Sequence, residues 1–180
     1  MFRISRETPA YYLTSVTYNR LPIFRTDALK EIVCEAFAEA RRSCGFMIFA
    51  YVIMPDHSHV ITDGTKEMSD VLRYLNGVSA KRVIDYLKAN GHESSLAKLR
   101  IQERENKHKH SVYQHHPNGI RLAGEASLFQ KIQYLHLNPV RANLVDHPNE
   151  YRFSSARQWH GRQLENEPLF TDHQQISWRK

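Results

Sequence analysis

Residues 46–61 constrain the fold more strongly than any other part of the sequence. The run from Phe46 to Met54 is apolar and rich in aromatic and β-branched side chains, a composition that favours a buried strand. Pro55 and Asp56 interrupt the run, and a second β-favouring segment covers residues 57–62. We therefore expect two paired strands joined by a short turn. Because the first strand is apolar on both faces, it is expected to be central in its sheet.

His57 and His59 are the chemically distinctive residues of these strands. Successive side chains alternate between the faces of a strand, so the two histidines point the same way, about 6–7 Å apart along it. Two imidazoles on one face can bind one divalent cation through their ring nitrogens. The same spacing also fits two surface or hydrogen-bonded histidines, so the pair alone does not decide between these alternatives.

The remaining sequence alternates strand and helix patterns. Thr26 is a plausible N-cap and Gly45 a stop for the first helix, and Pro139 is expected to limit the last helix. The order predicts an α+β fold, a ferredoxin-like sandwich whose antiparallel-rich sheet has helices packed mainly on one face. The expected elements are strands at 11–18 and 112–122, the second with a turn at Pro117-Asn118-Gly119, and helices at 27–43, 70–90 and 126–137.

One domain is expected to hold nearly all of the chain. The length of 180 residues and the 41% of hydrophobic residues suffice for one buried core. We assign residues 1–160 to this domain, with a basic loop insertion at about 91–110, and residues 161–180 to a C-terminal tail. The sequence contains no apolar run near the roughly 20 residues that span a bilayer and no CxxC pair. A soluble, cytoplasmic protein without membrane association is expected.

The net charge of +6 favours a polyanionic partner, and nucleic acid is the commonest one. Basic side chains gather on the helix expected at 70–90 and in the loop at 91–110. For any one of them, an ordinary solvated surface charge explains the residue at least as well as a DNA contact. The candidate DNA-binding residues are Arg73, Lys81 and Arg82 on the helix, and Lys98, Arg100, Arg104, Lys107 and Lys109 in the loop.

Tyr134 and Asn138 share a face of the last expected helix, and Lys131 lies one turn before them. If this helix crosses the sheet near His57 and His59, the Asn138 side-chain oxygen can complete a metal site and the Tyr134 phenol lies beside it. Such a site suits phosphoryl transfer by a tyrosinate. Because a phenol has a pKa near 10, it needs the metal or a cation such as Lys131 to ionise at neutral pH.

Three segments resemble motifs of one known family. Residues 54–61 (MPDHSHVI) resemble the HUH motif of the single-tyrosine transposases of the IS200-like superfamily. Residues 134–145 (YLHLNPVRANLV) resemble the tyrosine-helix motif of its REP-associated branch, and residues 151–156 (YRFSSA) resemble the ending of that branch. The similarity extends from about residue 14 to residue 159.

The chain departs from the family pattern in three places. Ser58 stands where a bulky hydrophobic residue is common, but its side chain is expected to point away from both histidines. Asn143 replaces the usual glycine, and asparagine tolerates left-handed backbone angles better than most residues. The basic stretch at 98–110 is longer than in compact members, which puts the mode of hairpin binding in question.

The resemblance implies a single-stranded DNA endonuclease and strand transferase that forms a 5′-phosphotyrosine link and uses Mg²⁺ or Mn²⁺. It implies that His57, His59 and Asn138 are metal ligands and that Tyr134 is the nucleophile. Its implied substrates are short hairpins in single-stranded DNA. Relatives of the IS200 type are dimers whose tyrosine helix serves the partner's site, whereas REP-associated members act as monomers, so both a monomer and a homodimer remain open.

Two other hypotheses are compatible with the sequence. A domesticated member of the family would bind single-stranded nucleic acid without cleaving it. A metal-dependent hydrolase would use water and leave no covalent adduct. The presence of all four site residues favours the transposase.

Overall fold

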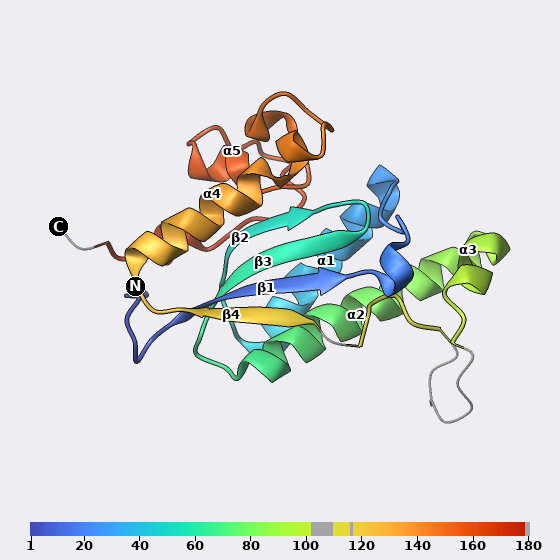
Figure 1. Cartoon of the computed structure of the whole chain (residues 1–180), viewed down its shortest axis with the longest axis horizontal. Helices are drawn as coiled ribbons and strands as arrows, with labels where there is room; N and C mark the ends of the chain where they lie inside the picture. Colours follow the sequence, from blue (N-terminus) through green and yellow to red (C-terminus); the bar gives the residue numbers. More distant parts are fainter. Residues whose placement is uncertain (102–109, 116, 179–180) are drawn as a thin grey trace.

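A four-stranded antiparallel sheet in the order β2-β3-β1-β4 forms the centre of the computed structural model, which describes residues 1–101, 110–115 and 117–178 (Figure 1). Strands and helices alternate in the ferredoxin-like manner, so the predicted α+β class is confirmed. The elements are β1 (Ala10–Val16), η1 (Tyr18–Arg20), α1 (Asp27–Cys44), β2 (Ile48–Ile53), β3 (His57–Asp63), α2 (Met68–Ala89), α3 (Glu93–Lys98), β4 (Asn118–Leu122), α4 (Glu125–Arg141), η2 (Pro148–Glu150), α5 (Ala156–Trp159) and η3 (His173–Gln175).

Helices cover both faces of the sheet. On one face, the Ser15 hydroxyl of β1 donates a hydrogen bond of 2.7 Å to Asn76 of α2, and α1 packs beside α2. On the other face, Tyr12 of β1 lies against Tyr134 of α4, with ring centroids 6.4 Å apart. The long helices α1 and α2 therefore share a face as predicted, and α4 lies across the opposite face with the short helix α5 beside it (Figure 1).

The first helix begins and ends as the sequence predicts. Thr26 is the N-cap of α1, and its side chain accepts a hydrogen bond of 3.4 Å from the Leu29 backbone N–H. Gly45 follows the helix with a φ of 76°, in the left-handed region that glycine adopts without strain.

Strand β2 lies at an edge of the sheet, so the prediction of a central position is wrong. All of its residues are nevertheless buried, because residues 153–155 cover the open edge. The Ile53 N–H donates to the Phe153 carbonyl at 2.9 Å, and the Ser155 N–H donates to the Tyr51 carbonyl at 3.0 Å. The apolar pattern of β2 reflects burial by helices on both faces and by this segment at the edge.

The predicted turn at 117–119 is also wrong, because Asn118 and Gly119 lie inside β4. Gly119 pairs with Leu13 of β1. A Cβ atom at position 119 would lie 2.1 Å from the Met68 sulfur atom at the start of α2. The glycine therefore leaves room for the Met68 side chain and does not form a turn.

Helix α4 continues past Pro139 to Arg141, which the sequence did not predict. Proline has no N–H, so the Leu135 carbonyl loses its normal helical donor. The Asn138 side-chain NH₂ lies 3.5 Å from this carbonyl and 2.8 Å from the Tyr134 carbonyl, and so supplies a substitute donor. Asn143 follows the helix with a φ of 53°, as expected for an asparagine in the place of glycine.

The sequence assigns residues 161–180 to a C-terminal tail and predicts a loose end from residue 163, but residues 167–178 are packed on the domain. Leu169 and Ile176 are only 2% and 3% exposed. The buried Glu167 carboxylate accepts hydrogen bonds of 2.9 and 2.8 Å from Arg157. Arg41 of α1 donates a hydrogen bond of 3.0 Å to the Asp172 carboxylate. Local patterns did not reveal this contact because the two residues are distant in the sequence. Across the parts of the chain that the structure describes, no helix is long and apolar enough to cross a membrane.

Candidate active site

His57 and His59 lie on the sheet face that α4 covers. Their ring centroids are 4.9 Å apart. Ser58, between them, points to the opposite face and is 1% exposed, as predicted from strand alternation. The two imidazoles are therefore close enough to bind one cation.

Each histidine is oriented through its Nδ1 atom. His57 Nδ1 lies 2.6 Å from the Asp56 carboxylate, and His59 Nδ1 lies 2.9 Å from the Thr14 hydroxyl, its cross-strand neighbour in β1. When Nδ1–H donates to these oxygens, each Nε2 retains a lone pair for a metal ion. This is the arrangement by which outer partners commonly hold metal-binding histidines.

The environment of His59 keeps its imidazole neutral. Burial, together with the neighbouring His57 and Lys131, lowers the pKa of His59 to about 3. A neutral imidazole is the form that binds a metal ion. His59 therefore requires no deprotonation at neutral pH before it can act as a ligand.

Tyr134 projects from α4 beside these histidines. Its ring centroid lies 6.1 Å from that of His59 in an edge-on arrangement, and the residue is 43% exposed. Two cations flank the ring, with Lys131 Nζ 5.5 Å and Arg141 Cζ 4.8 Å from its centroid. Tyr134 is thus accessible to a substrate and lies in a positively charged setting.

Tyr12 is a second tyrosine of this site, but its environment differs. Its ring stacks on that of His59, with centroids 5.1 Å apart and an angle of 24° between the planes. It is only 4% exposed, and burial, together with the nearby Tyr134, raises the pKa of Tyr12 well above its ordinary value. Tyr12 is suited to supporting the His59 ring and poorly suited to acting as a nucleophile.

Asn138 lies one turn after Tyr134 on α4, about 6 Å further along the helix axis. Because both hydrogen-bond partners of its side chain are backbone carbonyls, the amide nitrogen faces the helix and Oδ1 faces away from it. Within the described residues, no group of three or more His, Cys, Asp and Glu side chains could hold a metal ion. The Asn138 amide oxygen is the candidate third ligand beside the histidines, and an amide oxygen fits a Mg²⁺ or Mn²⁺ ion.

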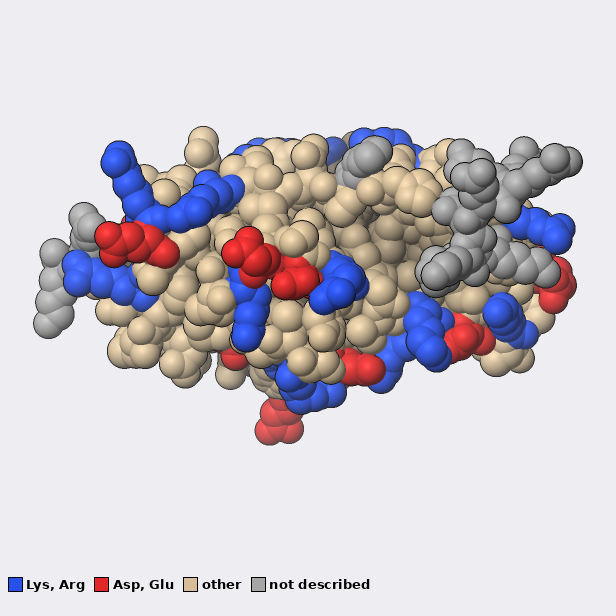
Figure 2. All heavy atoms as spheres, turned by 90° about the horizontal axis from the view of Figure 1, so that it is seen from below, with Lys and Arg blue, Asp and Glu red and all other residues tan. Residues whose placement is uncertain are grey.

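The candidate DNA-binding residues of α2 do not lie near this site. They are on the opposite face of the sheet, and each is paired with a carboxylate on the helical layer. Basic and acidic side chains are interspersed on the face shown in Figure 2. The pairs are Arg73 with Asp70 at 3.0 Å, Lys81 with Asp85 at 2.7 Å, and Arg82 with Glu35 at 3.2 Å and with Glu39.

The predicted basic loop is partly helical. Lys98 is the last residue of α3, and Arg100 follows it; both are exposed. Arg104, Lys107 and Lys109 lie outside the described residues.

Sequence reasoning missed four residues that surround the candidate site. Asp56 is adjacent to His57 in the sequence and could have been recognised as a carboxylate partner. Thr14 and Tyr12 contact His59 only through the pairing of β1 with β3. Arg141 lies two turns after Tyr134 on the same helix and could have been found from helical spacing.

The comparisons with known proteins agree with the fold. Residues 7–98, about half of the chain, match the IS200-like transposase family. This match includes both histidines and ends before Tyr134. A search of curated proteins found no match.

Two solved structures are similar to the chain. One is a REP-associated tyrosine transposase bound to a REP hairpin; it is 18% identical, covers 92% of this chain and 87% of its own, and gives a TM-score of 0.63. The other is a candidate transposase from Deinococcus radiodurans R1, 19% identical over 71% of this chain and 88% of its own, with a TM-score of 0.48. The first likeness extends the shared fold beyond residue 98 to most of the chain. Because the family match covers residues 7–98, about half of the chain, we conclude that the chain belongs to the IS200-like transposase family.

Proposed function

We propose that this transposase cleaves single-stranded DNA at hairpins and forms a 5′-phosphotyrosine intermediate through Tyr134. The observation that carries the proposal is the position of the Tyr134 ring beside His59 within one chain. A half-exposed phenol next to two imidazoles on a sheet face is the arrangement that tyrosine-mediated phosphoryl transfer requires.

His57 and His59, through their Nε2 atoms, and Asn138, through Oδ1, would hold a Mg²⁺ or Mn²⁺ ion. Such an ion, when bound, would polarise the scissile phosphodiester as a Lewis acid. Asp56 and Thr14 would keep the two imidazoles in the orientation for binding.

Tyr134 would act as the nucleophile. Its Oη forms a bond to phosphorus and loses its proton, while the bond from phosphorus to the 3′ oxygen breaks and that oxygen takes up a proton. Lys131 and Arg141 flank the Tyr134 ring and favour negative charge on the phenolate and the phosphoryl oxygens. Attack of a 3′-hydroxyl on the phosphotyrosine reverses these bond changes and joins DNA strands.

Hairpins are proposed as the substrate because the structurally similar REP-associated tyrosine transposase is bound to a REP hairpin. The positive net charge supports a DNA partner. Lys131 and Arg141 are positive charges beside the candidate nucleophile, whereas Arg73, Lys81 and Arg82 of α2 are paired with carboxylates.

The proposal is tested by incubating the protein with Mg²⁺ or Mn²⁺ and a panel of hairpin oligonucleotides that carry single-stranded 5′ tails. We expect a protein–DNA adduct that survives SDS, is lost in Tyr134→Phe and is retained in the control Tyr12→Phe. Bound but uncleaved DNA across all substrates and metals would instead support a non-cleaving binding protein. Cleavage that persists in Tyr134→Phe would indicate attack by water.

A further inference from the structure

A groove distinct from the histidine site runs between η1 with its following loop and helix α3. It consists of two cavities of about 340 and 510 Å³ that share Lys98 as a lining residue. The first lies between residues 21–29 and α3, and the second continues past Lys98 towards Tyr18 and His115. The two cavities adjoin at Lys98, and together they are called the groove below.

The rim of this groove carries three exposed cations, Arg25, Lys98 and Arg100. No ion pair engages any of them within the part of the chain that the structure describes. The basic residues of α2 differ, since Arg73 and Lys81 each lie within 3.0 Å of a carboxylate. The groove is therefore positively charged without internal neutralisation, and it complements a polyanion.

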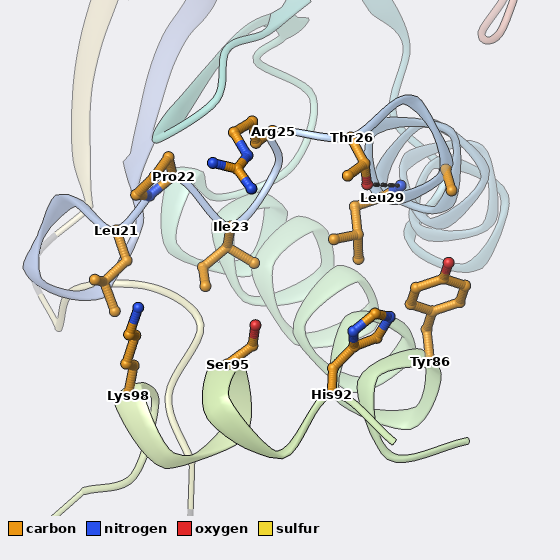
Figure 3. Close-up of a pocket in the computed structure, with 11 residues that line it drawn as sticks. Leu21, Pro22, Ile23, Arg25, Thr26, Leu29, Tyr86, His92, Ser95 and Lys98 are labelled. Carbon is orange, nitrogen blue, oxygen red and sulfur yellow. Dashed lines mark hydrogen bonds between the residues drawn. The ribbon is translucent and has the colours of Figure 1, made fainter. Parts of the chain in front are cut away.

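The walls of the first cavity are apolar and aromatic, whereas polar and basic side chains predominate in the second. Figure 3 shows Lys98 and Ser95 pointing from α3 across the first cavity towards Leu21 and Ile23. At its other end, the Tyr86 and His92 rings lie 5.9 Å apart with 24° between their planes. Apolar and aromatic walls below a cationic rim suit unpaired bases whose phosphates stay at the surface.

The groove is connected to the loop that precedes His57. The Phe24 N–H donates to the Pro55 carbonyl at 2.9 Å, and Arg20 of η1 lies 3.5 Å from the Asp56 carboxylate. Asp56 in turn holds His57. The segment that forms one wall of the groove is therefore anchored to the loop that positions His57, and DNA that leaves the histidine site at this end of the sheet would pass this segment.

We propose that this groove binds the single-stranded DNA that continues from the phosphodiester at the histidine site. The proposal rests on the function proposed above and assigns a second binding region to the same substrate. Lys98 and Arg100 contact phosphates there, and the apolar and aromatic walls receive bases.

The test uses Tyr134→Phe protein, which keeps the DNA intact, and two fluorescent probes. One is a hairpin with a single-stranded tail of about 12 nucleotides, which is long enough to occupy the groove. The other is the same hairpin without a tail. The groove variant carries Lys98→Ala and Arg100→Ala in this Tyr134→Phe background. It should bind the tailed hairpin about five- to ten-fold more weakly than the parent. The slope of log K against log salt should become shallower by about 1.4, because each charge on a single strand contributes about 0.7.

Arg42→Ala with Lys66→Ala is the matched control. It removes the same charge from the end of α1 and from the loop after β3, at the opposite end of the sheet from His57. We expect this control to bind both probes about as the parent does, and the groove variant to bind the untailed hairpin about as the parent does.

Equal affinity of the groove variant and the control for the tailed hairpin would overturn the proposal. Equally weakened binding of the tailed and the untailed hairpin by the groove variant would also overturn the proposal, because the groove would then contact the stem. The assay needs no cleavage, so its result is separate from the adduct test. If the wild type forms no adduct but the groove variant binds the tailed hairpin more weakly, only the proposed cleavage function is refuted. If the wild type forms the adduct and the groove variant binds the tailed hairpin normally, only the proposed role of the groove is refuted.

Discussion

Tyr134 of α4 and His59 of β3 form a T-shaped ring pair in the same chain, with ring centroids 6.1 Å apart and an angle of 70° between the planes. The sequence left open whether the tyrosine helix serves its own chain or a partner. In this arrangement the candidate nucleophile and the candidate metal ligands of one chain form a single site.

This relationship predicts the outcome of a complementation experiment. We expect that mixing Tyr134→Phe protein with a His57→Ala, His59→Ala variant does not restore adduct formation, because each chain lacks part of its own site. Wild-type protein mixed with either variant should remain active and serves as the control. Recovery of the adduct in the mixture of inactive variants would show that the tyrosine acts in the partner's site.

Thr14 is expected to control metal binding through His59. Thr14→Val keeps the shape of the side chain but removes the oxygen that lies 2.9 Å from Nδ1. We expect metal affinity to fall about 10- to 100-fold, the usual effect of removing a ligand's outer partner. Thr14→Ser, which retains a hydroxyl, should bind Mn²⁺ nearly as the wild type does in titration calorimetry. Equal Mn²⁺ affinities for all three proteins would exclude an orienting role for Thr14.

Asn138 is expected to contribute both to the metal site and to helix α4. Asn138→Ala removes Oδ1 and the donor to the Tyr134 carbonyl, so both Mn²⁺ affinity and stability should fall, the latter by about 1 kcal/mol. Asn138→Asp keeps an oxygen ligand but loses the donor, so it should retain metal binding with a lower stability. Denaturant titration and calorimetry measure the two effects separately. An Asn138→Ala protein with unchanged Mn²⁺ affinity would exclude this residue as a ligand.

His136 is expected to make folding stability depend on pH. Its Nε2 lies 2.9 Å from the buried Ser155 hydroxyl, and burial lowers the pKa of His136 to about 3, with His160 and His173 adding to the effect. The unfolded chain takes up the proton near the ordinary pKa of about 6.5, so the unfolded state binds more protons between these values. The contribution of neutral His136 to the free energy of unfolding should therefore be fully present above pH 6.5 and should decrease as the pH falls towards 3. The expected loss at pH 5 is on the order of 2 kcal/mol.

Urea unfolding at pH 7 and pH 5 measures the direction in which the free energy of unfolding changes with pH. A His136→Gln variant keeps a polar group for Ser155 but cannot titrate, so its stability should change less between the two pH values. The same loss in both proteins would mean that other groups cause the pH dependence.

The fold was largely predictable because its elements are encoded locally. Thr26 and Gly45 delimit α1, and strand alternation places His57 and His59 on one face. The errors concern relationships between distant segments. The edge of β2 is covered by residues 153–155, and the C-terminal segment is held by contacts such as that of Arg41 with Asp172. Local periodicity reports burial but not which segment causes it.

The principal residues of the candidate site were predictable from the sequence, but the contacts that position them were not. Spacing and the family resemblance indicated His57, His59, Tyr134 and Asn138. The register of β1 against β3, which brings Thr14 to His59, is a property of strand pairing and has no local signal. The continuation of α4 past Pro139 depends on a side-chain donor that replaces the missing N–H, a compensation that propensity alone does not reveal.

The most direct test of the proposed chemistry identifies the residue that carries the DNA. Two tyrosines lie within 6.1 Å of the His59 ring, measured between centroids, but Tyr134 is half exposed whereas Tyr12 is buried. The adduct formed with Mn²⁺ and a hairpin substrate is digested with protease and nuclease, and the modified peptide is sequenced by mass spectrometry. We expect a nucleotide linked through a 5′-phosphate to Tyr134. A nucleotide on Tyr12 or on another residue would contradict the assignment of Tyr134 as the nucleophile.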